Sequence, residues 1–241
     1  MNVWTFCLLH NEAPLLPYFL RHYAPLSERV ILYDDHSSDG GPSLAQAYAN
    51  VTVRPYPGGG LDDLAFVEFA GQAYREARGQ ADWIIWVDAD EFVYHPALRS
   101  VLAGYTFQGF TLARTLGYAM WAERFPSGAG QIYDEIKSGV VDPHYAKPVI
   151  LNPAVDIAWH AGKHGLLSGA ETVRESPAEI KLLHYRHLGQ AYYDGRNARN
   201  YGRMSAANIA RGHGFQTYPQ NQAENGWGGQ LKHFANPEQV L

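Results

Sequence analysis

The sequence has a single cysteine, no long apolar run and no excess of basic residues. Cys7 is the only cysteine among 241 residues, so no disulfide can form within the chain. No apolar run approaches the roughly 20 residues that a membrane-spanning helix needs. Lysine and arginine number 19 against 24 acidic residues, which gives a net charge of −5. That balance argues against a nucleic-acid-binding protein, which would carry a basic face.

The composition is that of an ordinary globular protein with a large core. Hydrophobic residues make up 46% of the chain and charged residues 18%, so we expect one large domain. The first strand begins almost at Met1, without a basic leader and cleavage site, so we expect no signal peptide. The expected location is therefore cytoplasmic, with at most peripheral contact at the inner face of the membrane.

An acidic stretch follows a buried strand near the middle of the chain. Residues 83–87 (WIIWV) are aromatic and β-branched, a pattern typical of a fully buried strand. Asp88, Asp90 and Glu91 come directly after it. Carboxylates two residues apart can hold a hard divalent cation and the diphosphate bound to it. The alternative is a solvated strand end in which an aspartate caps the next helix.

The segments before this stretch predict a parallel sheet. Strands are expected at residues 3–9, 29–33, 51–53 and 83–87, with helices between them. Asn11 is expected to cap the helix after the first strand, and Asp62 or Asp63 the helix before the fourth. Short alternating connections of this kind indicate an α/β sheet covered on both faces. The polar clusters at residues 10–12, 34–39 and 88–91 should then meet at one edge of the sheet, where ligands bind.

The second half of the chain gives weaker signals. Strands are predicted at residues 110–116, 147–152 and 180–185, and a basic helix at residues 190–212. Residues 117–139 are rich in loop formers, and they form either an irregular connection or an acceptor-binding surface. Arginines at helical spacing in the basic helix predict either a solvated face or contact with phosphate; they are Arg196, Arg199 and Arg203. Lys147 and Lys163 are further candidates for phosphate contact.

Three motifs in this order resemble the nucleotide-sugar half of the family-2 glycosyltransferases. They are HNE at residues 10–12, DDHSSDG at residues 34–40 and WIIWVDADEF at residues 83–92. The second half resembles a bacterial subgroup of these sequences through GQIYDEIK, KLLHY and GWG, at residues 130–137, 181–185 and 226–228. The resemblance implies a GT-A fold, which is a Rossmann-like, mostly parallel central sheet flanked by helices. It divides one continuous domain into a nucleotide-sugar half, residues 1–95, and a mixed acceptor half with a C-terminal helix and tail, residues 96–241.

The resemblance also implies roles for particular residues. Asp35 would bind the uracil or ribose, and Asp90 would ligate Mn²⁺ or Mg²⁺ between the two phosphates. The residues expected to contact the donor are His10, Asn11, Glu12, Asp35, Asp62, Asp88, Ala89 and Lys147. The expected metal ligands are Asp88, Asp90, His184 and His164.

The implied reaction is an inverting transfer from a nucleotide-sugar donor, by family habit a UDP-sugar, to a saccharide or glycolipid acceptor in bacterial surface polysaccharide synthesis. A carboxylate base should come from the second half; the candidates are Asp134, Glu135 and Glu123. Two alternatives remain, a non-catalytic carbohydrate- or nucleotide-binding protein on the same fold and a nucleotidyltransferase. The latter should carry a Gly-rich, basic loop after the first strand, where residues 10–12 stand instead.

Overall fold

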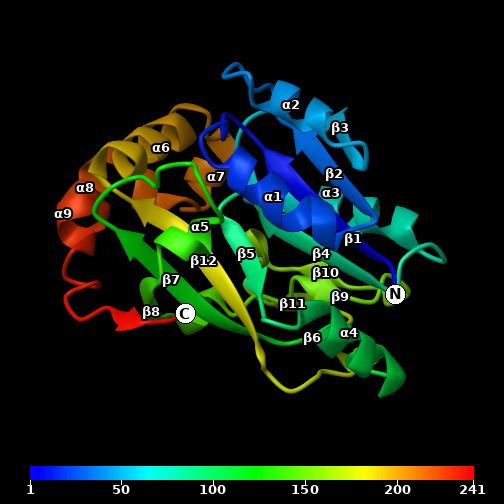
Figure 1. Cartoon of the computed structure of the whole chain (residues 1–241). Helices are drawn as coiled ribbons and strands as arrows, with labels where there is room; N and C mark the ends of the chain where they lie inside the picture. The colour runs from blue at the N-terminus through cyan, green and yellow to red at the C-terminus, as the bar shows by residue number, and fades with distance from the viewer.

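The computed structural model describes all residues 1–241, and a six-stranded sheet organises the N-terminal half (Figure 1). The strand order is β3-β2-β1-β4-β9-β6. The first four of these strands are parallel, whereas β9 is antiparallel to both of its neighbours. The strands are β1 (Val3–Leu9), β2 (Arg29–Asp34), β3 (Val51–Pro55), β4 (Trp83–Asp88), β6 (Leu112–Ala113) and β9 (Ile150–Leu151). The predicted parallel sheet is therefore confirmed.

Alternation along the strands fills a core on each face of this sheet. In β1, Val3 and Cys7 belong to one apolar cluster, and Trp4 and Phe6 belong to the other. This follows from the two-residue period of a strand, which sends successive side chains to opposite faces. The first cluster contains residues of α1 and α4, and the second contains residues of α3. The helices of this half are α1 (Leu16–Leu26), α2 (Gly41–Leu44), α3 (Asp63–Ala73) and α4 (Leu98–Phe107).

A second sheet of five strands begins at the end of the acidic stretch, with Glu91. Its order is β13-β8-β7-β12-β5, and β5 pairs antiparallel with β12. A separate ribbon is formed by β10 (Ala158–Trp159) and β11 (Leu166–Ser168). The strands of the five-stranded sheet are β5 (Glu91–Tyr94), β7 (Thr115–Ala122), β8 (Ser138–Val141), β12 (Ile180–Leu188) and β13 (Glu238–Gln239). Because β5 lies in this sheet, the second sheet begins a few residues before the expected boundary at residue 95.

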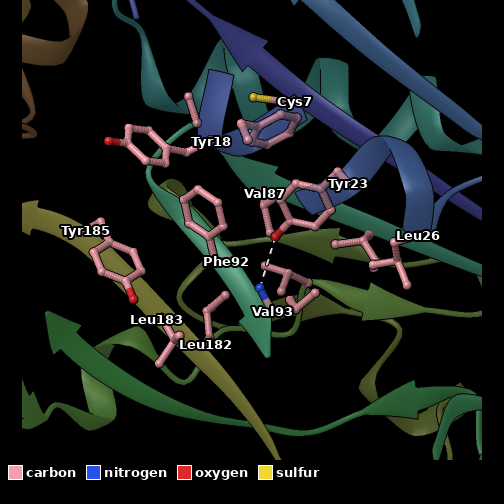
Figure 2. Close-up of a cluster of buried hydrophobic side chains, with 14 of the residues drawn as sticks. Cys7, Tyr18, Tyr23, Leu26, Val87, Phe92, Val93, Leu182, Leu183 and Tyr185 are labelled. Carbon is pink, nitrogen blue, oxygen red and sulfur yellow. Dashed lines mark hydrogen bonds between the residues drawn. The ribbon is translucent and has the colours of Figure 1, made fainter. Parts of the chain in front are cut away.

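One apolar cluster joins the two sheets (Figure 2). Phe92 and Val93 of β5 lie in it with Leu182 of β12 and with residues of β1, β4 and α1. The Tyr23 hydroxyl is buried there; it donates to the Glu91 carbonyl at 2.9 Å and accepts from the Val93 N–H at 3.0 Å. These two bonds satisfy backbone groups where the chain passes from one sheet to the other.

Short helices cover the second sheet at its far end. Trp227 and Phe234 stack on Trp121 of β7, with ring centroids 6.2 and 6.0 Å from it, so the C-terminal segment is packed onto the sheet. The helices are α5 (Ile132–Glu135), α6 (Gln190–Gly202), α7 (Ala206–Ala210), α8 (Gln222–Asn225) and α9 (Trp227–Gln230). None of the helices is both long and apolar enough to cross a membrane.

The local predictions differ from the structure in three places. Asn11 does not cap α1; its backbone has φ 50°, and its side-chain oxygen accepts from the N–H groups of Ser38 and Asp39. Residues 117–139 are more regular than expected, because β7, α5 and the start of β8 fall within them. The helix predicted over residues 190–212 is two helices, with a break after Gly202. At that break the backbone instead bonds to Leu61.

Candidate functional site

A cavity of about 570 Å³ lies where the carboxyl ends of β1 and β4 meet the second half of the chain. Its walls come from these strand ends, the start of α3, β12, α6 and residues 212–217. The volume falls within the range of about 300–1,000 Å³ found for small-molecule sites. The lining includes four carboxylates, five lysines and arginines, and six histidines. This is the edge of the sheet at which the sequence predicted a ligand site.

The turn between β4 and β5 places Asp88 at the cavity and Glu91 behind it. Glu91 is fully buried; it accepts from the Asp88 N–H at 2.9 Å and from Lys147 Nζ at 2.5 Å. Asp88 accepts from Lys163 Nζ at 2.5 Å and lies 3.8 Å from Lys147 Nζ. Burial alone would raise the pKa of Asp88, but the ammonium groups of Lys163 and Lys147 outweigh it and hold that pKa at about 2. Asp88 is therefore a carboxylate at neutral pH.

Asp90 is also paired with cationic and imidazole groups. One of its oxygens accepts from Arg196 Nη1 at 2.5 Å and lies 3.0 Å from His184 Nε2. Arg196 also donates to Glu12 through Nε at 2.7 Å. The Arg196 and His184 groups keep the pKa of Asp90 well below its usual range, although its side chain is buried. Arg196 therefore connects the end of β1 to the β4–β5 turn.

A third acid–base pair lies at the end of β2. Asp35 is 2% exposed and pairs with Arg203, while its carbonyl lies 2.6 Å from His10 Nδ1. Burial lowers the pKa of Arg203 to about 10, so the guanidinium still carries its charge at neutral pH. His10 and Arg203 line the cavity, with Asp35 behind them. The exposed edges of this group are an imidazole and a guanidinium.

A left-handed backbone conformation places one of the cavity lysines. Three residues other than glycine have positive φ: Asn11 at 50°, His36 at 58° and Lys163 at 60°. They follow β1, follow β2 and lie in the loop between β10 and β11, respectively. Lys163 is only 1% exposed, and its Nζ lies 4.7 Å from the centre of the Phe66 ring. A lysine held in this conformation costs free energy, and such costs are most often found at functional sites.

The acids of this site do not form a metal site by themselves. No group of three His, Cys, Asp or Glu side chains lies close enough to hold a metal ion. Asp88 is paired with Lys163 and Asp90 with Arg196. His164 is held away by a 2.8 Å contact to the His144 carbonyl and by a ring stack at 3.7 Å. One oxygen of Asp90 is buried without a hydrogen-bond partner, which leaves a single protein donor for an ion that also binds the phosphates of a ligand. The protein side chains alone therefore do not enclose the expected Mn²⁺ or Mg²⁺.

Eight of the predicted site residues line the cavity together. They are His10, Glu12, Asp88, Ala89, Asp90, Lys147, His164 and His184. Asp35 lies one layer behind, and Asn11 serves the adjoining turn. Asp62 instead caps α3 and accepts from Ser205 Oγ at 2.8 Å.

The three predicted bases lie outside the cavity lining. Asp134 accepts from the Gln131 N–H within α5, and Glu135 accepts from the Ser127 N–H. Glu123 follows β7 on an exposed stretch. The carboxylates of α5 are thus used by the local backbone of their own loop.

Several cavity residues were not singled out from the sequence. Arg186, Asp63 and His213 line the cavity, as does the aromatic ring of Phe66. The helical spacing of Arg196 and Arg203 allowed two interpretations, and the solvated face is wrong for both, because their side chains are 14% and 15% exposed. The sequence predicted Asp63 only as a possible helix cap. Its hydrogen bond with Asn208, 145 positions further along the chain, could not be predicted from local sequence.

No protein-family model and no curated protein sequence matches the chain. Solved structures do. The crystal structure of S. aureus TarS is similar over 100% of this chain and 50% of its own, with a TM-score of 0.53 and 16% identity. The chain thus spans half the length of that protein. A structure of S. aureus TarS 1-349 in complex with UDP-GlcNAc has a TM-score of 0.47 and 12% identity, over 98% of this chain and 75% of its own.

A second protein among the similar structures is glucosyl-3-phosphoglycerate synthase from Mycobacterium tuberculosis, in complex with Mn²⁺, UDP and glucosyl-3-phosphoglycerate. It covers 48% of this chain and 44% of its own, with a TM-score of 0.35 and 19% identity. At these sequence identities the similarity supports a shared fold and nothing more specific. The mixed α/β architecture is the GT-A fold that the sequence motifs predicted.

Proposed function

We propose that the protein is a glycosyltransferase that binds a nucleoside-diphosphate sugar, a UDP-sugar, in the cavity and transfers the sugar to a saccharide or glycolipid hydroxyl. The observation that carries the proposal is the set of buried cations around Asp88 and Asp90. Lys147 and Lys163 are 4% and 1% exposed, and Arg196 is 14% exposed. Each of these cations has a carboxylate partner, which offsets the cost of burying it and fixes the charged groups at the cavity.

The two ends of the cavity suit the two ends of such a donor. His10 and Asp35, with Arg203, would bind the base and ribose at the ends of β1 and β2. The diphosphate would lie toward the end of β4, within reach of Lys163. Binding across the carboxyl ends of neighbouring parallel strands is the general pattern of open α/β sheets.

In the proposed reaction the acceptor oxygen attacks the anomeric carbon in one displacement, with inversion. The bond from that carbon to the phosphate oxygen breaks, and the diphosphate leaves with the electron pair. Lys163 would stabilise the charge that develops on it, because a preoriented cation in a partly dehydrated site is worth several kcal/mol in the transition state. Since the side chains alone do not enclose a metal ion, no step is assigned to one.

Calorimetric binding of UDP and UDP-GlcNAc tests the proposal. UDP-GlcNAc is chosen because the fold resembles that of TarS, which has been crystallised with it. We expect binding to the wild type in the presence of EDTA. Lys163→Met should weaken it tenfold to a hundredfold, since a charge-assisted hydrogen bond contributes about 1.5–3 kcal/mol.

The matched control is Lys232→Met, which removes an exposed lysine that is not among the residues lining the cavity. It should bind UDP as the wild type does. If neither UDP nor UDP-GlcNAc binds, with EDTA or with Mn²⁺, and GDP and CMP also fail, the protein is not a nucleotide-sugar transferase. A non-catalytic role on the same fold would then be favoured.

A further inference from the structure

We propose that Asp63, oriented by His213, is the general base that removes the proton from the acceptor hydroxyl. This inference rests on the proposed function and assigns a residue to its acceptor half-reaction. Asp63 is the first residue of α3, and His213 lies in the segment after α7. Both line the cavity, so the two side chains meet a ligand from opposite parts of the sequence.

Asp63 differs from the other acids of the cavity in having no lysine or arginine partner. Glu12 and Asp90 are paired with Arg196, and Asp88 is paired with Lys163. A carboxylate in such an ion pair is stabilised in its charged form and is a poor proton acceptor. Of the four carboxylates in the lining, Asp63 is thus the one whose basicity is not reduced in this way.

The surroundings of Asp63 hold it in place without neutralising it. Asn208 accepts from the Asp63 N–H at 2.9 Å and donates to its carboxylate at 3.2 Å. His213 Nδ1 lies 3.8 Å from the same carboxylate oxygen and has no hydrogen-bond partner. Gly212 and Gly214, with φ of 71° and 67°, flank His213 and set the direction of its turn. A small movement of the imidazole would complete an Asp–His hydrogen bond.

Electrostatics support the same assignment. Burial raises the pKa of Asp63; the Asn208 hydrogen bond and His213 lower it, while the nearby carboxylates Asp88 and Asp62 raise it again. The net shift is upward. Brønsted behaviour favours a base whose pKa is raised toward the working pH, because its conjugate acid is then a better proton sink.

The wall beside Asp63 suits a sugar acceptor. Phe66 lies one turn further along α3, and Phe215 lies two residues beyond His213. Phe215 is 54% exposed although it lines the cavity, so its ring offers an apolar surface beside polar groups. In the proposed step the proton of the acceptor hydroxyl passes to an Asp63 oxygen. At the same time the acceptor oxygen bonds to the anomeric carbon, and the bond from that carbon to the phosphate oxygen breaks.

The test is the turnover of UDP-GlcNAc with water as the acceptor, measured as UDP release. Asp63→Asn keeps the size of the side chain and an oxygen that can accept from Asn208. We expect it to slow UDP release by a factor of about 100 or more, the usual contribution of a general base, while the affinity for UDP is unchanged. Glu68→Gln is the matched control, because Glu68 is an exposed acid on the same helix. Its turnover should equal that of the wild type.

Azide separates a catalytic from a structural role. As an anion it needs no deprotonation, so Asp63→Ala should form glycosyl azide from UDP-GlcNAc at a rate close to wild type while its hydrolysis stays slow. Equal hydrolysis by Asp63→Asn and wild type would overturn the assignment and leave the proposed function intact. Absence of nucleotide binding by the wild type would instead overturn the proposed function. Binding without any turnover would count against both.

Discussion

Single residues at the cavity are held in unusual states. Lys163 has a left-handed backbone and a nearly inaccessible side chain, and its ammonium lies against Asp88 and over the Phe66 ring. The preceding residue, Gly162, is also left-handed, with φ of 71°, so two successive left-handed residues position the Lys163 amine. The cation thus sits where a divalent ion would have to contact Asp88.

Removing Lys163 should change the metal affinity of the ligand-free protein. We expect the wild type to bind Mn²⁺ weakly, because the Asp88 carboxylate is already paired. Lys163→Met should bind Mn²⁺ at least about tenfold more tightly, since an unpaired carboxylate near Asp90 becomes available to a hard cation. Titration calorimetry or Mn²⁺ electron paramagnetic resonance measures the two affinities.

Lys232→Met is again the control and should match the wild type. Tight binding of Mn²⁺ by the wild type, unchanged in Lys163→Met, would show that Mn²⁺ binds without competing with Lys163 for Asp88. The metal-dependent mechanism implied by the sequence motifs would then regain its support.

Residue-scale prediction from sequence succeeds where neighbours in the chain are neighbours in the site. Asp88 and Asp90 follow a strand whose apolar character fixes their position, so the sequence placed them correctly. The partners of these acids come from residues 163 and 196, and no local pattern pairs them. Asp63 shows the same limit. Its neighbours in the site are Asn208 and His213, which lie far along the chain, so the sequence around Asp63 does not show that its carboxylate lacks a cationic partner.

Among the elements, the first four strands were predictable, whereas in the second sheet only β12 lies where a strand was clearly expected, at residues 180–185. Strands β1 to β4 are buried and separated by short helical connections, a repetitive pattern with one topology. By contrast, β5 has four residues, starts at the last of the acids, Glu91, and pairs with β12, about 90 residues later. Short strands with long-range partners carry too little local signal to be assigned to a sheet.

Helix α1 carries a histidine whose protonation should depend on folding. His22 Nε2 lies 3.0 Å from the Val93 carbonyl, and the ring packs on Phe92 and Tyr133. Burial lowers its pKa from 6.5 to about 4, opposed by the Val93 contact. The unfolded chain therefore binds a proton between pH 6.5 and 4 that the folded protein does not.

His22 should make the free energy of unfolding fall as the solution is acidified. Its contribution is complete above pH 6.5 and is lost as the pH falls toward 4, amounting to up to about 2 kcal/mol between pH 7.5 and pH 5. Urea unfolding at both pH values measures it, and His22→Gln should show a loss smaller by that amount. His233→Gln, at a histidine that is 45% exposed, should behave as the wild type does. An equal loss in His22→Gln and wild type would contradict the prediction.

At the scale of the whole molecule, the two sheets share one core. The cluster that contains Cys7 and Val87 of the first sheet also contains Phe92, Leu182 and Tyr185 of the second (Figure 2). The cavity likewise takes its walls from both halves. The halves proposed from the sequence therefore cannot be separated without exposing apolar surface.

A fragment of residues 1–95 should consequently fail to fold by itself. It lacks β12, which pairs with β5, and β9, which pairs with β4. We expect no cooperative thermal transition by circular dichroism and strong binding of a hydrophobic dye. The full chain should unfold in a single transition. A sharp, cooperative melt of the fragment would show instead that the first sheet is an independent folding unit.

The lone cysteine allows the opening of β1 to be measured by thiol labelling. Cys7 is completely inaccessible at the centre of β1, and burial raises the pKa of its thiol well above the usual value. A thiol reagent can therefore label the chain only when the middle strand of the parallel sheet opens, and no other thiol competes for the reagent. The labelling rate reports how often that opening occurs, and any compound that holds β1 against β4 will slow it. Ligand searches can thus be run without knowing the acceptor or having an activity assay.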